Sequence, residues 1–88
     1  MSYTLTAEGL VDPSTHTTLA AAVVALRGLL DDLPLDPGQA RAYDFFLTGE
    51  AGVRRVQDYL DQDDGRFALD VLVSGHSYTA VIAVTSSG

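Results

Sequence analysis

The chain has 88 residues, of which 12 are acidic and five are basic, and its formal net charge is −7. This length suits one domain over residues 1–88 with one modest core, and the 47% share of hydrophobic residues predicts that it folds. Because the chain lacks cysteine, it can form neither disulfides nor thiolate metal sites. The negative charge disfavours nucleic acids and anionic membranes as partners and favours proteins with basic surfaces.

The first elements predicted along the chain are a strand and a helix. Residues 2–8 alternate between apolar and polar side chains, which indicates a half-buried strand. Asp12 and Pro13 are residue types that cap and begin helices, and apolar side chains recur at helical spacing from Leu19 onward. We therefore expect a helix that begins at this Asp-Pro pair and ends before Pro34.

A second Asp-Pro pair, Asp36-Pro37, predicts the start of another helix, with Gln39 placed as in a capping box. Its apolar stripe continues to about Gln62, but Thr48-Gly49 weakens its middle. The pattern allows one long helix or two shorter ones, and we favour one element with a kink or break at that point. Gly65 then suits the left-handed position that follows a helix.

The last third of the chain predicts a β-hairpin. Two β-rich runs, 66–74 and 77–85, flank Gly75-His76, which suits a two-residue type II′ turn. This turn places four apolar pairs on one face of the hairpin. The predicted pairs are Phe67 with Val84, Leu69 with Ile82, Val71 with Ala80 and Val73 with Tyr78.

These elements give the order β-α-α-β-β. A hairpin alone is marginal in water, but a three-stranded sheet with helices packed on one face closes a single core. We therefore predict an α+β fold, a two-layer sandwich with a mainly antiparallel three-stranded sheet.

The sequence contains no complete catalytic or metal-binding motif. Residues 71–78 locally resemble the nucleophile elbow of α/β-hydrolases, but Thr79 stands where that family has its second glycine, and no histidine or acid follows. The predicted fold does not bring His16, in the first turn of a helix, together with His76 at the hairpin tip. We expect neither enzyme activity nor a cofactor or metal ion.

Acidic side chains gather at the predicted helix ends. Aspartates at a helix C-terminus oppose the macrodipole, so their presence at two such ends suggests a role in binding a partner. The alternative is that they only promote turns and solubility. The candidate partner-binding residues are Asp31, Asp32, Asp36, Asp61, Asp63 and Asp64.

Arg54 and Arg55 suggest a different function. If the long helix breaks at Thr48-Gly49, three helices precede the hairpin, and this order resembles winged helix-turn-helix domains, which read DNA with the third helix. The net charge and the acids that follow on the same helix count against DNA binding. Pairing of Arg54 with Asp58 on a solvated helix face is the structural alternative.

The second face of the predicted hairpin is apolar at its centre. In the predicted register Leu72 and Val81 are diagonal neighbours, and the outer strands lack the Lys and Pro residues that often block edge pairing. We therefore expect a homodimer, or docking of a partner segment, through this face or a sheet edge. The predicted self-association face consists of Ala68, Leu72, Val81 and Ala83.

Together these features predict a non-catalytic, acidic protein–protein interaction domain, such as an accessory, immunity or inhibitor-like domain that docks on a basic partner. A winged-helix-like regulator, with or without DNA binding, is the first alternative, and a small-ligand-binding or enzyme domain is the second. The N-terminus has no basic region followed by an apolar run, and the longest apolar stretch, 19–30, is too short to cross a bilayer. We therefore expect a cytoplasmic protein that does not bind membranes.

Overall fold

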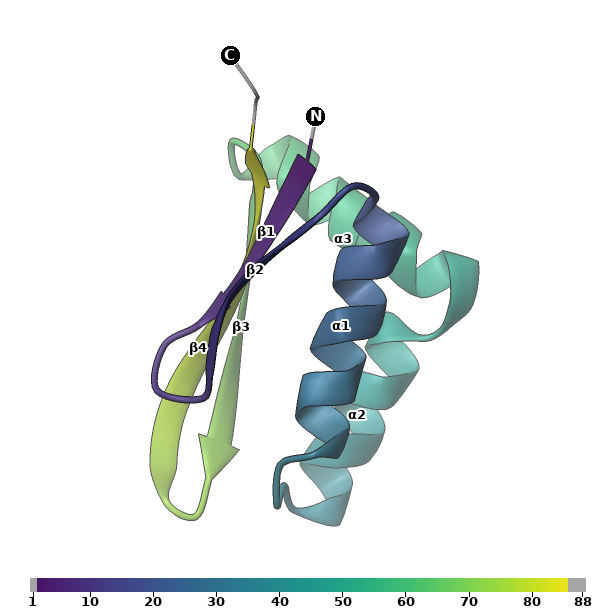
Figure 1. The fold of residues 1–88 in the computed structure, drawn as a ribbon. Coiled ribbons are helices and arrows are strands. Elements are labelled where there is room, and N and C mark those ends of the chain that lie inside the picture. The colour runs from purple at the N-terminus through teal and green to yellow at the C-terminus, as the bar shows by residue number, and fades with distance from the viewer. Residues whose placement is uncertain (1, 86–88) are drawn as a thin grey trace.

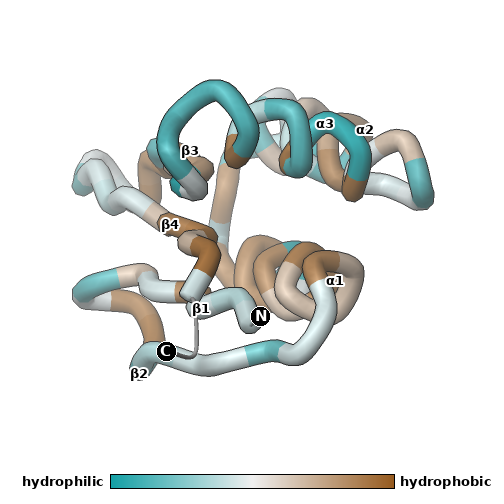
Figure 2. Tube along the Cα trace, turned by 90° about the horizontal axis from the view of Figure 1, so that it is seen from above, coloured by the Kyte–Doolittle hydropathy of each residue, from teal (hydrophilic) through white to brown (hydrophobic). Residues whose placement is uncertain are grey.

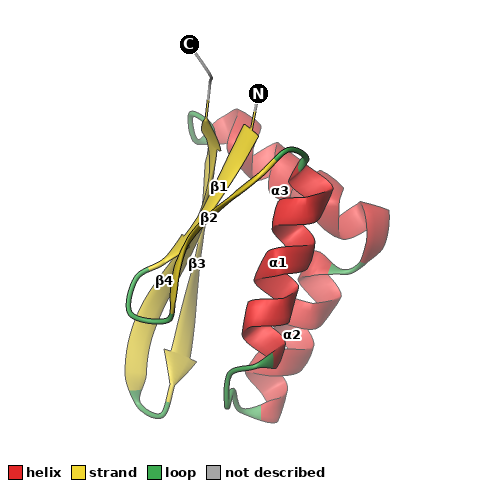
Figure 3. Cartoon of the chain, in the orientation of Figure 1, coloured by secondary structure: helices red, strands yellow, loops and turns green. Residues whose placement is uncertain are grey.

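The computed structural model describes residues 2–85, which form one sheet and three helices in the order β-β-α-α-α-β-β. The elements are β1 (Ser2–Ala7), β2 (Val11–His16), α1 (Leu19–Asp31), α2 (Pro37–Leu47), α3 (Gly49–Gln62), β3 (Arg66–Val73) and β4 (His76–Thr85). The sheet is antiparallel, with the strand order β2-β1-β4-β3. All three helices lie on one face of it (Figure 1), and Figure 3 shows the two layers by element type. The predicted α+β class is confirmed, whereas the predicted element order and three-stranded sheet differ in detail from this architecture.

The strand that the sequence did not reveal is β2. Asp12 and Pro13 begin no helix; they lie in β2, which pairs with β1 and places Ser14 opposite Leu5. The first helix instead begins after Thr18, whose Oγ1 accepts a hydrogen bond from the Ala21 N–H at 3.1 Å. Residues 13–18 carry no apolar stripe that a helix could bury, so these residues gain more by pairing with the edge of β1.

The long helix of the prediction is two helices, separated at Thr48. Gly49 has a φ of 66°, a left-handed conformation that glycine adopts without strain, and it turns the chain between α2 and α3. The Arg55 Nη1 group donates hydrogen bonds at 3.1 Å to the carbonyl oxygens of Phe45 and Phe46, which are left unpaired where α2 ends. The break predicted at Thr48-Gly49 is therefore confirmed, and a side chain of α3 stabilises it.

The β3–β4 hairpin forms, but its register differs from the prediction. The turn is Ser74-Gly75, with φ values of 51° and 84°, and Val73 lies opposite His76. Positive φ at both central residues fits a type I′ turn, whose twist matches that of the flanking strands. Every predicted pair is thus wrong by two residues, and Phe67 lies opposite Ile82. Because the shift is even, each side chain keeps its predicted face.

The core lies between the sheet and the helices. Figure 2 shows hydrophobic residues along most of α1, in contrast to the mixed colouring of α2 and α3. The buried side chains come from the inner face of the sheet and from all three helices: Leu5, Ala7, Leu19, Ala22, Val23, Leu26, Leu30, Leu47, Val56, Leu60, Phe67, Val71, Ala80 and Ile82.

Candidate interaction surface

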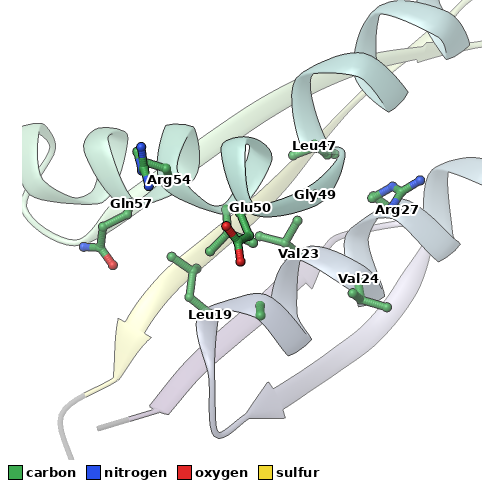
Figure 4. Close-up of a pocket in the computed structure, with 11 residues that line it drawn as sticks. Leu19, Val23, Val24, Arg27, Leu47, Gly49, Glu50, Arg54 and Gln57 are labelled. Carbon is green, nitrogen blue, oxygen red and sulfur yellow. The ribbon is translucent and has the colours of Figure 1, made fainter.

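A groove of about 590 Å³ runs between α1 and α3 (Figure 4). Its volume lies in the range of ligand and peptide sites, and its walls are mainly aliphatic. Leu19 and Val23 line it from α1, and Leu47 and Val53 line it from the α2–α3 side. The side chains at its rim are polar, namely Arg27, Glu50, Arg54 and Gln57. No sequence motif marked this groove, because it depends on how two helices that are distant in the chain pack together.

The outer face of α1, which we define as Ala20, Ala21, Val24 and Gly28, continues the groove toward solvent. All four residues are exposed, and Val24 is 64% exposed. None of them is charged, although a surface helix usually carries polar residues on its outer face. The signal available in the sequence was that apolar residues occur all around this helix rather than in one stripe.

One ion pair lies at the end of the groove. The Arg27 Nη2 atom of α1 is 2.9 Å from the Asp44 Oδ1 atom of α2, and this is the one ion pair within 4 Å that residues 2–85 contain. The pairing of Arg54 with Asp58, which was the structural alternative to DNA binding, does not form an ion pair within 4 Å among these residues. Glu50 lies in the first turn of α3, where its negative charge suits the helix dipole, and Arg54 follows one turn later.

The two arginines of the predicted DNA-reading helix do not share one surface. Arg54 is exposed at the groove, whereas Arg55 turns toward the end of α2, with its guanidinium carbon 5.2 Å from the centre of the Phe45 ring. The hydrogen bonds of Arg55 to two carbonyl groups hold it there. The structure thus offers no pair of neighbouring arginines on α3 for phosphate contacts.

The candidate acidic residues form two separate patches at opposite ends of the molecule (Figure 1). We call them the α1–α2 patch (Asp31, Asp32 and Asp36) and the α3 patch (Asp61, Asp63 and Asp64); all six side chains are exposed. In the first patch the Asp36 Oδ1 atom caps α2 by accepting from the Gln39 N–H at 3.0 Å. In the second, the Asp61 Oδ1 atom accepts from the Gln57 side chain at 2.9 Å.

The predicted self-association face is not continuous. Leu72 lies opposite Ser77 and Val81 lies opposite Ala68, so Leu72 and Val81 are not the diagonal neighbours that the predicted register made them. The pair Asp70–Thr79 separates them, and the Thr79 Oγ1 atom donates to the Asp70 Oδ1 atom at 2.9 Å. Ala83 lies on the same side of Val81 as Arg66, which faces it across the hairpin. A polar pair therefore divides the proposed apolar centre.

The edges of the sheet are blocked in two different ways. The β2 edge contains Pro13, which has no N–H to donate, so the expectation that outer strands lack proline is wrong. At the β3 edge, the Gln39 side chain donates to the Leu72 carbonyl and accepts from the Leu72 N–H, both at 2.9 Å. Gln39 therefore does not complete a capping box but occupies the strand edge as a neighbouring strand would.

Tyr43 extends this cover of the β3 edge. Its hydroxyl group donates a hydrogen bond to the Asp70 carbonyl oxygen. Burial, and then the negative charges of Asp70 and Asp36, raise the pKa of Tyr43 above its usual value of 10.0. The hydroxyl therefore stays protonated and able to donate.

The predicted histidine positions are half right. His76 lies at the hairpin tip as expected, whereas His16 ends β2 instead of beginning a helix, with its Nε2 atom 2.9 Å from the Ser14 Oγ atom. Within residues 2–85 no group of three or more His, Asp or Glu side chains could hold a metal ion. None of the helices within residues 2–85 is both long enough and apolar enough to span a bilayer. Comparisons with family models, curated proteins and solved structures found no match to this chain.

Proposed function

We propose that this chain is a non-catalytic protein-interaction domain that binds an apolar segment of a protein in the groove between α1 and α3. The observation that supports this proposal is the continuity between the groove and the uncharged outer face of α1. Single exposed apolar residues are common on monomeric domains, but a contiguous apolar surface that joins a groove is typical of an interaction site. This apolar surface is therefore suited to cover by another protein segment.

The composition of the groove fits the recognition of a helix. An amphipathic helix binds such a groove through apolar residues at every third or fourth position, while polar groups at the rim set its orientation. Val24 and Val53 would contact the apolar face of the bound helix. Glu50 and Arg54 lie at the rim and would select among the charged groups that flank this apolar face.

The acidic patches would have a separate role. They lie outside the groove, at opposite ends of the molecule, so they cannot form its apolar contacts. Exposed charges act mainly through the rate of encounter and are screened by salt. We propose that the patches attract partners with basic surfaces and that the groove provides the lasting contact.

A library of displayed helical peptides tests this proposal. Wild-type protein, immobilised at low density, is used to enrich peptides, which are then measured against Val24→Asp and against Leu72→Asp. Both substitutions place the same charge at an exposed apolar residue, one at the groove and one on the sheet. We expect Val24→Asp to weaken binding at least about tenfold, equivalent to 1.4 kcal/mol, and Leu72→Asp to leave it unchanged. Failure to enrich any apolar helical peptide, or equal binding by both variants, would contradict the proposal.

A further inference from the structure

We infer that the partner of this groove is a second copy of the same chain, with the two α1 helices packed antiparallel around a two-fold axis near Val24. This inference rests on the proposed function, since it names the occupant of the same groove. In such an arrangement both copies use one surface, and each α1 covers the groove of the other. Three features of the structure support it.

The first feature is the shape of the outer face of α1. Val24 projects beside the groove (Figure 4), so in an antiparallel pair the Val24 side chain of each copy can enter the groove of the other. Its neighbours Ala20, Ala21 and Gly28 are small and allow the helix axes to approach to about 8–10 Å. A Cβ atom added to Gly28 would meet nothing within 4 Å, so this space is open in the single chain.

The second feature is the distribution of charge along α1. Asp31 and Asp32 lie at the C-terminal end, where they oppose the dipole of their own helix, while the first turn of Leu19–Asp31 contains no acid. Antiparallel pairing centred near Val24 brings these two aspartates to Thr17 and Thr18 of the other copy. The unfavourable acids of one helix then lie at the favourable N-terminus of the other.

The N-terminus of α1 has donors to offer. Thr18 accepts from the Ala21 N–H, but among residues 2–85 the N–H groups of Leu19 and Ala20 have no acceptor. A carboxylate at a helix N-terminus can accept from such groups. Charge complementarity therefore favours the antiparallel register over the parallel one, which would bring the four aspartates of two copies together.

The third feature is that this face is free of net charge in a chain with a net charge of −7. The outer face of α1 is uncharged, Glu50 and Arg54 at the opposite wall carry opposite charges, and Arg27 at the rim is paired with Asp44. The α3 patch lies at the C-terminal end of α3, where Asp61 accepts a hydrogen bond from the rim residue Gln57. Along the groove, two copies can therefore meet without placing unpaired acidic groups opposite each other. At the ends of α1, Asp31 and Asp32 of one copy lie at the helix N-terminus of the other.

Light scattering and sedimentation of the wild-type chain from low to high micromolar concentration test the inference. We expect a mass that rises from 9.3 kDa toward twice that value. Val24→Asp should remain monomeric over this range, and Gly28→Gln, which fills the open space without adding charge, should do the same. Leu72→Asp is the matched control and should dimerise like the wild type. Circular dichroism of each variant checks that the fold is retained.

Reversal of the acids tests the register. Asp31→Lys combined with Asp32→Lys lowers the net negative charge, so general repulsion alone predicts tighter association. The antiparallel register predicts weaker association, by about tenfold or more, because the lysines would face a helix N-terminus. A tighter dimer in this variant would overturn the register.

The outcomes separate this inference from the proposed function. A wild-type chain that stays monomeric, or a dimer that Leu72→Asp breaks and Val24→Asp does not, overturns the inference. If helical peptides still bind the monomeric chain in a Val24-dependent manner, the proposed function stands with another partner. A Val24-dependent dimer without peptide binding supports the inference and contradicts binding of a partner helix from another protein.

Discussion

The first helix and the α2–α3 pair cover the same face of the sheet but are held there differently. The polar side chains of α2 and α3 bind backbone groups of other elements: Gln39 binds Leu72, Tyr43 binds Asp70, and Arg55 binds the end of α2. Within residues 2–85, the polar side-chain contact that joins α1 to another helix or to the sheet is the exposed ion pair between Arg27 and Asp44. Burial of apolar side chains therefore holds α1 almost alone.

This difference explains where an apolar surface remains. Side-chain hydrogen bonds to backbone groups help to fix the position of α2 and α3. The outer sides of these helices carry charged residues such as Arg41, Asp44 and Asp58 beside the exposed rings of Phe45 and Tyr59. Apolar residues surround α1, and those on its outer face stay exposed because none of the elements described in residues 2–85 covers them.

Adding one methyl group to a glycine should have opposite effects in α3 and α1. A Cβ atom at Gly52 would lie 2.2 Å from the carbonyl carbon of Leu47, so Gly52→Ala must push α3 away from the end of α2. We expect a loss of about 3 kcal/mol or more in the free energy of unfolding. Gly28→Ala has open space in α1 and should gain up to about 1 kcal/mol from helix propensity. Urea unfolding of dilute protein measures both, and similar changes in the two variants would contradict the comparison.

Removing the Gln39 side chain should loosen the β3 edge. Gln39→Ala leaves the N–H and carbonyl groups of Leu72 without their protein partners, which we expect to cost about 1–2 kcal/mol. The amide proton of Leu72 should exchange with solvent much faster than in the wild type. Gln57→Ala is the control, because the Gln57 side chain bonds only to an exposed carboxylate, and it should change stability by a few tenths of a kcal/mol. Unchanged protection of Leu72 in Gln39→Ala would show that the strand edge does not need this side chain.

The smallest effect is expected at Tyr43, and it depends on pH. The pKa of Tyr43 is raised in the folded chain, so between the unfolded and folded pKa values the unfolded chain has lost its proton while the folded chain keeps it. The contribution to stability is therefore complete below pH 10.0 and is lost as the pH rises through the folded pKa. Tyr43→Phe should cost roughly 1 kcal/mol at neutral pH and flatten the alkaline decline in stability. If stability falls as steeply at alkaline pH in Tyr43→Phe as in the wild type, other groups cause the decline.

Two Asp-Pro pairs show how far the sequence predicts this fold. Asp36-Pro37 begins a helix as predicted, whereas Asp12-Pro13 lies in a strand. The residues after Pro37 include good helix formers, while four of the five residues after Pro13 are Ser or Thr, which are poor helix formers in a helix interior. An Asp-Pro pair alone therefore does not predict a helix. The composition of the roughly five residues that follow it decides between helix and strand.

Other features could not be read from local patterns. The face of each hairpin residue was predicted because alternation is local, but the register depended on Ser74 adopting a left-handed conformation, which few serines do. The cover of the β3 edge by Gln39 and the groove beside Val24 both join residues distant in the chain. Composition could indicate an uncovered apolar surface, but only the packing of α1 against α3 places it.

The most direct test of the account is the solvent accessibility of two methyl-bearing residues at concentrations where copies can meet. In the single chain Val24 and Leu72 are similarly exposed, at 64% and 53%. A soluble paramagnetic chelate broadens the NMR signals of methyl groups that it can approach. If the groove and the outer face of α1 form the interaction surface, raising the protein concentration should protect the Val24 methyl groups and leave those of Leu72 accessible. Equal broadening of both at every concentration, or protection of Leu72 alone, would contradict the account.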